Sequence, residues 1–161
     1  MPSTRYRAIE AAALFNPVFG AYILTCAVNA AIKAEAGQPL SWPSAFLVLP
    51  LVLPEDTRAD LPVKASRSMA AWLADHPQHR ALFPQRAAHL TEYTRASLRT
   101  GVRHGALQIT AQGIRCPRSP RKPSIDHGSE VVDCAKKAIL VGRWLAVVNS
   151  ATAFTLLGVR P

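Results

Sequence analysis

The sequence predicts an α+β fold that is mainly helical, formed by a single domain over residues 1–161. Several stretches carry apolar residues at the spacing of a buried helix face, and two short β-type runs flank a turn at 111–113. The chain has 161 residues, 49% hydrophobic and 18% charged, and is long enough to bury a core. The order of helix, β-hairpin, basic loop and C-terminal helix is winged-helix-like.

The first predicted helix begins at Asn16 and Pro17 and ends near Gly37. Asn is a favoured N-cap, Pro is tolerated in a first turn, and Gly is a common stop signal. Apolar residues occupy most of its circumference, so we expect burial on several sides. Residues 11–32 are also long enough to span a bilayer, which leaves a small membrane-associated protein as an alternative. Asn16, Pro17 and Asn29 interrupt that run, which favours a buried helix and no membrane contact.

The following segment, QPLSWPSAFLVLPLVLPED, contains four prolines. Because proline removes a helical hydrogen bond and clashes with the preceding turn, these prolines predict extended segments rather than a long helix. The run AFLVL within it is expected to be buried. Residues 55–65 are expected to form a polar turn region.

Two further helices are predicted before the hairpin. Ser66 or Ser68 is a suitable N-cap for a short helix that ends before Pro77. A longer helix is predicted over residues 84–104, whose leucines share one apolar arc.

The hairpin is predicted from ALQIT and IRC around a turn at AQG, with Leu107 and Ile109 packed inward. A loop over 117–129 follows, rich in Pro, Ser, Lys and Arg. Ser129 is a suitable N-cap for the next helix, EVVDCAKKAILVGRWLAVV. Asn149 or Ser150 then begins a short terminal helix, ATAFTLL, which Gly158 closes.

The sequence carries no motif of a catalytic, metal or cofactor site. It has neither a GxSxG elbow nor a GxxxxGK[ST] loop, so no enzyme activity and no bound cofactor are expected. In ADHPQH, Asp75, His76 and His79 are interpreted as a solvated helix end, because a proline breaks the helix that would align the histidines.

Three cysteines, Cys26, Cys116 and Cys134, are too widely spaced for a zinc motif or a disulfide framework. Their pattern fits a reducing compartment, so a cytoplasmic protein is expected. A set of Cys116, His127 and Asp126 can be drawn as a catalytic triad, but nothing local supports it.

The charge pattern points to a binding surface. The net charge is +9, and the 93–125 stretch holds seven basic residues and no acidic one. Three of the seven recur every four residues on the predicted long helix, and the others lie in a basic loop of about 115–128. The seven are Arg95, Arg99, Arg103, Arg115, Arg118, Arg121 and Lys122. Three interpretations of these residues stay open. They contact DNA phosphates without base specificity, they contact acidic residues of a partner protein, or they form a solvated surface with no partner.

Other residues are candidates for a protein interface. Trp72 and Trp144 lie in helical patterns, where core packing is the first interpretation and an interface the alternative. The C-terminal FTLLGVRP stays apolar, so we expect it to dock on the domain or on another chain. The predicted interface set is Asn16, Pro17, Trp72, Trp144, Val159, Arg160 and Pro161.

Five stretches occur in an order that resembles a known family. They are NPVFGAYIL, FLVLPLVLPEDTRADLP, SMAAWL, TRASLRTGVRHGALQI and GRWLAVVNSATAFTLLGVRP. In this order the chain resembles the middle component of bacterial three-component ABC systems, over nearly its whole length. The matching positions are Asn16, Pro17, Leu61, Pro62, Trp72, Gly142, Trp144 and 158–161. The insertion-like PRSPRKPSIDHG departs from the pattern and leaves DNA contact open.

The resemblance implies a non-catalytic adaptor that couples an SMC-like ABC ATPase to an effector protein, a nuclease or other toxic enzyme. Such systems act in anti-phage or anti-mobile-DNA defence, and the family brings no catalytic or metal residues. Contact with non-specific DNA stays open, and a stand-alone winged-helix DNA-binding protein remains the alternative.

Overall fold

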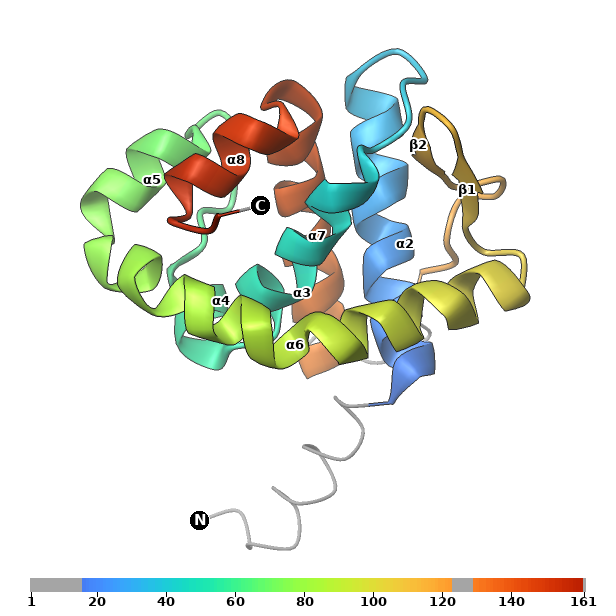
Figure 1. Ribbon diagram of the computed structural model, residues 1–161, viewed down its shortest axis with the longest axis horizontal. Coiled ribbons are helices and arrows are strands. Elements are labelled where there is room, and N and C mark those ends of the chain that lie inside the picture. The colour runs from blue at the N-terminus through green and yellow to red at the C-terminus, as the bar shows by residue number, and fades with distance from the viewer. Residues whose placement is uncertain (1–15, 123–128, 161) are drawn as a thin grey trace, which may run out of the picture.

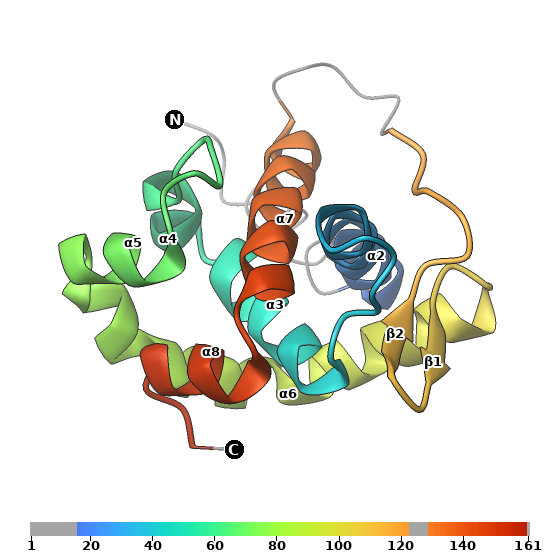
Figure 2. The ribbon, with the colours of Figure 1, turned by 90° about the horizontal axis from the view of Figure 1, so that it is seen from above.

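The computed structural model describes residues 16–122 and 129–160, which form packed helices with a small hairpin at one end of the molecule (Figure 1). The helix beside the hairpin is α2 (Pro17–Ala34), and it packs mainly against α7 (Glu130–Val147) and α6 (Pro77–Arg103). Figure 2 shows α2 nearly end-on, with α7 on one side and the hairpin on the other. The mainly helical α+β prediction is confirmed, whereas the winged-helix comparison remains a prediction.

α2 begins and ends as the sequence predicts. The Asn16 side chain accepts a hydrogen bond from the Val18 amide at 2.9 Å, and Pro17 occupies the first turn. After Ala34 the chain turns through Gly37, at a φ of 84° that favours glycine. By length and composition α2 is the one described helix that alone qualifies as a membrane span. Here more than half of it is buried, against α6 and α7.

Small residues allow α2 to approach its neighbours closely. A Cβ atom added to Gly142 of α7 would lie 2.2 Å from the Ala27 carbonyl oxygen of α2. A Cβ atom added to Gly20 would lie 2.1 Å from the Ser97 hydroxyl oxygen of α6. These two glycines therefore set the separation of the three longest described helices.

The prediction of extended structure between residues 38 and 56 is wrong. The segment contains a 3-10 turn η1 (Trp42–Ser44), α3 (Ala45–Val52) and the start of α4 (Glu55–Asp60). The polar turn predicted at 55–65 is therefore helical over 55–60 and consists of bends and turns over 61–65. Two of the prolines mark where these helices begin, and only Pro50 lies inside one. The burial of AFLVL is confirmed, apart from the half-buried Phe46.

The next two helices are separated by a single residue. α5 (Met69–Asp75) begins at Ser68, whose hydroxyl oxygen accepts a hydrogen bond from the Ala71 amide at 3.1 Å. α6 begins at Pro77 rather than near residue 84, because Pro84 lies inside the helix instead of at its start. Its C-terminal turns lead directly to the hairpin (Figure 1).

The hairpin consists of β1 (Gln108–Thr110) and β2 (Gly113–Arg115), with Ile109 opposite Ile114. Leu107 is buried as predicted, but Ile109 is 57% exposed, so the prediction that it packs inward is wrong. The reason is the order of the strands. β2 forms a bridge to Leu40 and holds Ile114 in the core, while β1 is the outer strand.

The C-terminal part caps and closes the fold. Ser129 caps α7 and Asn149 caps α8 (Ser150–Leu156), each through a side-chain oxygen, as predicted. Beyond α8, Leu157 is fully buried, and the Arg80 guanidinium of α6 donates to the Leu156 carbonyl at 2.9 Å. Of the two alternatives for the tail, the structure therefore shows docking on its own domain.

Candidate interaction surface

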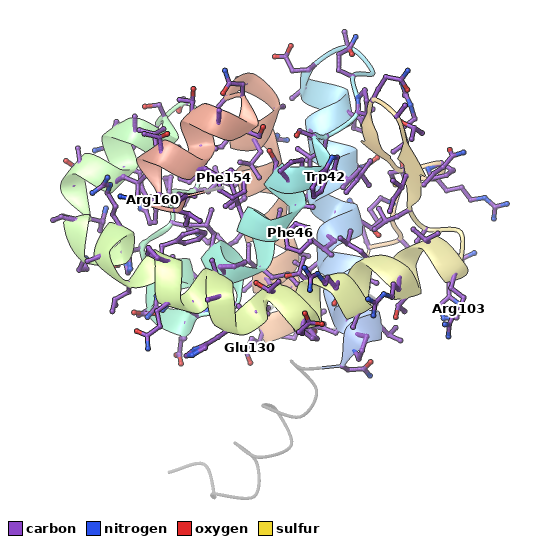
Figure 3. All side chains as sticks on the ribbon, viewed as in Figure 1. Trp42, Phe46, Arg103, Glu130, Phe154 and Arg160 are labelled. Carbon is purple, nitrogen blue, oxygen red and sulfur yellow. The ribbon has the colours of Figure 1, made fainter. Side chains whose placement is uncertain are left out.

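The arginines of α6 border an apolar groove at the hairpin end of the molecule. Arg95, Arg99 and Arg103 are exposed and recur at one-turn intervals, as predicted from the sequence. Beside them lie Leu98, Val102 and Ile109, and the six side chains enclose an open cavity of about 510 Å³. Figure 3 shows Arg103 at this end, where α6 meets the strands.

The other predicted basic residues do not line this groove. Arg115 neighbours Ile114 on β2, so its side chain points to the opposite face of the hairpin, where its guanidinium donates to the Gly37 carbonyl at 3.1 Å. The loop with Arg118, Arg121 and Lys122 runs along α2, held by a hydrogen bond from the Tyr22 hydroxyl to the Arg121 carbonyl at 3.1 Å. The seven basic residues therefore form two groups, and the rest of the basic loop, 123–128, lies outside the described residues.

The structure also places the predicted interface residues. Trp72 and Trp144 are 1% and 2% exposed with ring centroids 5.6 Å apart, so the interface alternative is wrong and core packing holds. Their indole N–H groups donate to the Asp60 and Arg67 carbonyls, both at 2.8 Å.

The remaining interface candidates lie near the two ends of the chain. Asn16 caps α2 and is exposed, Pro17 is half-buried, Val159 is half-buried and Arg160 is exposed. Pro161 lies outside the described residues.

Sequence reasoning missed an exposed aromatic surface. Trp42 is 59% exposed and its ring meets Phe46 edge-to-face, with ring centroids 6.5 Å apart. Figure 3 shows both side chains over the middle of the molecule, away from Arg103. The one available signal was the tetrapeptide SWPS, whose serine and proline are typical of a helix start. Trp42 therefore stands at the beginning of a short helix and belongs to no apolar face.

Sequence reasoning also missed a buried ion-pair cluster at Arg58. Its guanidinium contacts Glu130 at 2.7 Å and Asp133 at 2.9 Å, while the Arg58 side chain is only 5% exposed. It also donates to the carbonyls of Val52 at 3.0 Å and Leu53 at 2.8 Å. This one side chain ties the end of α3 to the first turn of α7.

In a second polar cluster, a threonine, a histidine and an aspartate are linked by hydrogen bonds. The His79 Nε2 atom lies 2.7 Å from Asp60 Oδ2, and its Nδ1 atom lies 3.3 Å from the Thr57 hydroxyl oxygen. Thr57 is only 2% exposed, and its oxygen accepts a hydrogen bond from Arg86 at 2.6 Å. That oxygen is covered and already engaged, so the arrangement offers no accessible nucleophile.

The interpretation of ADHPQH as a solvated helix end is wrong for His79. Although the helix breaks at His76, just before Pro77, the rings of His76 and His79 lie 5.8 Å apart and both stack against Trp72. His79 is 4% exposed, and Asp75 forms an ion pair with Arg67 instead. Among the described residues no group of His, Cys, Asp or Glu has the arrangement of a metal site.

The three cysteines are free thiols with raised pKa values. Burial raises the pKa of Cys26 and of Cys134 to about 11, and it also raises the pKa of the half-buried Cys116. His127 and Asp126, the other members of the hypothetical triad, lie outside the described residues.

We expect these thiols to resist modification in the native protein. The thiolate is the form that reacts with Ellman's reagent, so native protein at neutral pH should react slowly at Cys116. Cys26 and Cys134 should react only after guanidinium has unfolded the protein. The unfolded chain loses these protons at a lower pH than the folded chain. The free energy of unfolding should therefore fall as the pH rises from about 9 towards 11. Rapid reaction of all three thiols in native protein would contradict this.

Comparison with known proteins gives one match. No curated protein and no solved structure is similar enough to this chain to match. A family model for the ABC-three component (ABC-3C) system Middle Component 3 matches residues 4–161, which is nearly the whole chain. The chain therefore belongs to the Middle Component 3 family of ABC-three component systems.

Proposed function

We propose that this chain is a non-catalytic coupling subunit that bridges an SMC-like ABC ATPase and an effector enzyme in a cytoplasmic anti-phage or anti-mobile-DNA defence complex. The observation that carries the proposal is membership of the Middle Component 3 family, which makes the chain one component of a three-component ABC system. The match extends over residues 4–161 and supports treating them as one functional domain.

The surface of the molecule supports a bridging role. A subunit that joins two partners needs two separate contact surfaces, and two distinct features are exposed here. One is the arginine-bordered groove of α6 and β1, and the other is the aromatic surface of Trp42 and Phe46. They differ in chemistry as well as in position, since one is cationic and the other aromatic.

The interior supports a non-catalytic role. The described side chains that most resemble a catalytic set are Thr57, His79 and Asp60, which are hydrogen-bonded to one another between α4 and α6. Thr57 and His79 are buried, and Asp60 is partly exposed. The buried cation Arg58 is held by two carboxylates and two carbonyls. These groups hold helices together, and the buried Thr57 hydroxyl and His79 ring are already engaged by neighbouring side chains.

We expect the ATPase and the effector to co-purify only when this chain is present. The test co-expresses the products of the two flanking genes with and without the tagged chain, and measures each pairwise complex by size-exclusion chromatography. An ATPase–effector complex that forms equally well without the chain would overturn the bridging role. An effector activity that resides in this chain alone would overturn the non-catalytic assignment.

A further inference from the structure

The groove at the end of α6 combines an apolar floor with a cationic border. Leu98 and Val102 lie one turn apart on α6, and Ile109 of β1 faces them across the cavity. Val102 is 42% exposed and Ile109 is 57% exposed, so an apolar strip continues from the core to the surface. Along one side run the three arginines, also one turn apart.

Two of the three border charges, those of Arg99 and Arg103, are not neutralised by an acidic side chain within the described part of the chain. Five of the ten acidic residues form ion pairs with arginine, and four of these lie elsewhere, on Arg58, Arg67 and Arg86. A sixth, Asp60, is hydrogen-bonded to His79. Glu92 pairs with Arg95 at 2.5 Å, and among the described residues no acidic side chain pairs with Arg99 or Arg103. The nearest sequence adds no acid, because none occurs between residues 93 and 125.

The chemistry of the groove selects one class of occupant. A DNA backbone is satisfied by cations alone and gains nothing from a floor of Leu98, Val102 and Ile109. Single-stranded nucleic acid prefers aromatic stacking surfaces, and the groove contains no aromatic side chain. An amphipathic helix with carboxylates beside its apolar face matches both features, since arginine binds carboxylates through paired hydrogen bonds.

We infer that this groove binds an acidic amphipathic helix of a partner component, with apolar side chains seated on Leu98, Val102 and Ile109 and carboxylates paired with Arg99 and Arg103. The inference rests on the proposed function, because it names the chemistry of one partner. Two other occupants fit less well. Residues 1–15 of this chain carry Arg5 and Arg7 against one acid, and a second copy of a chain with a net charge of +9 would be repelled.

The direct test uses a labelled peptide of roughly 18 residues, long enough to form a helix, with leucines on one face and glutamates flanking them. Fluorescence anisotropy with the full chain measures its affinity, and a scrambled peptide of the same composition is the control. We expect Val102→Ser with Ile109→Ser, and separately Arg99→Glu with Arg103→Glu, to weaken binding by about tenfold or more. Arg118→Glu with Arg121→Glu, on the loop beside α2, should change it little. Thermal melts establish that each variant is folded.

A charge swap sharpens this test. A peptide with lysines in place of its glutamates should bind the Arg99→Glu, Arg103→Glu protein better than it binds the unmodified protein. Equal binding of the scrambled peptide, or no effect of the Ser variants, would overturn the inference. The opposite result is a protein that binds a DNA duplex more tightly than the peptide, with an affinity that the Ser variants keep and the Glu variants lose. That result would show that the arginines contact nucleic acid and would overturn the inference.

The same variants separate this inference from the proposed function. If the peptide fails to bind but the ATPase and effector still assemble through the unmodified chain, the groove assignment is wrong and the bridging role stands. If the peptide binds but no assembly forms with either partner, the bridging role is wrong. When both hold, the groove variants should abolish co-purification of one partner and retain the other.

Discussion

Replacement of Arg58 by methionine is expected to lower the free energy of unfolding by about 3 kcal/mol, because it breaks a buried ion-pair cluster. The substitution keeps most of the apolar stem but removes every donor. It leaves the Val52 and Leu53 carbonyls without their partner and places Glu130 and Asp133 side by side without a cation. The effect should lie near the lower end of the range of about 3–5 kcal/mol for buried pairs, since both carboxylates retain some water contact. Urea unfolding followed by circular dichroism measures it.

Three variants test the cause of this loss. Arg58→Lys keeps the charge but a single ammonium cannot reach four acceptors, so it should recover only part of the stability. Adding Glu130→Gln and Asp133→Asn to Arg58→Met removes the carboxylate repulsion and should also recover part. Arg67→Met is the matched control. Its ion pair with Asp75 is about half exposed, and its loss should cost no more than about 1 kcal/mol. An equal cost at positions 58 and 67 would show that burial does not govern the cluster.

Local signals were sufficient to predict where most helices begin. Asn16, Ser68, Ser129 and Asn149 each cap a helix through a side-chain oxygen, as their sequence context predicts. The hairpin was predictable for the same reason, since a short turn between two β-type runs is a local feature. Capping and turns depend on residues within about four positions, so they can be read from the sequence alone.

The errors arose where a residue type has two meanings. The proline pattern predicts helix breaks at Pro43 and Pro54. In the structure Pro43 lies in the first turn of a helix and Pro54 at an N-cap position, and both places tolerate proline. Pro50 and Pro84 lie inside helices, where the surrounding core outweighs the lost hydrogen bond. In α3 nearly every side chain is buried, and that burial depends on contacts with other helices that no local rule contains.

The candidate site was predictable only in part, for a related reason. The spacing of Arg95, Arg99 and Arg103 fixes them on one face of a helix, so the cationic border followed from the sequence. The apolar floor did not, because Ile109 is exposed through the pairing of β2 with Leu40, more than 70 residues earlier in the chain. The partners of Arg58 are separated from it by 72 and 75 residues, which puts that cluster equally beyond local inference.

Replacement of Gly142 by valine is expected to lower the free energy of unfolding by about 3 kcal/mol, and replacement by alanine by a smaller amount. Glycine should therefore be more stable than alanine at this position, which reverses their usual order in a helix. In an exposed helix, alanine is more favourable than glycine by about 1 kcal/mol. At Gly142, however, an added Cβ atom would lie 2.2 Å from the Ala27 carbonyl oxygen and 2.9 Å from the Ala27 Cα. These are backbone atoms of α2, so they cannot rotate away, and α2 and α7 must separate.

Arg143, the next residue of α7, is exposed and supplies the matched control. There, Arg143→Ala should be more stable than Arg143→Gly by about 1 kcal/mol, because only helix propensity differs. At position 142 the order should reverse, with glycine more stable than alanine and alanine more stable than valine. Urea denaturation of the five proteins gives the comparison directly. If alanine is the more stable residue at both positions, the close approach of α2 and α7 does not determine the stability of this fold. If the order reverses only at position 142, the separation of the two helices is set there by the absence of a side chain.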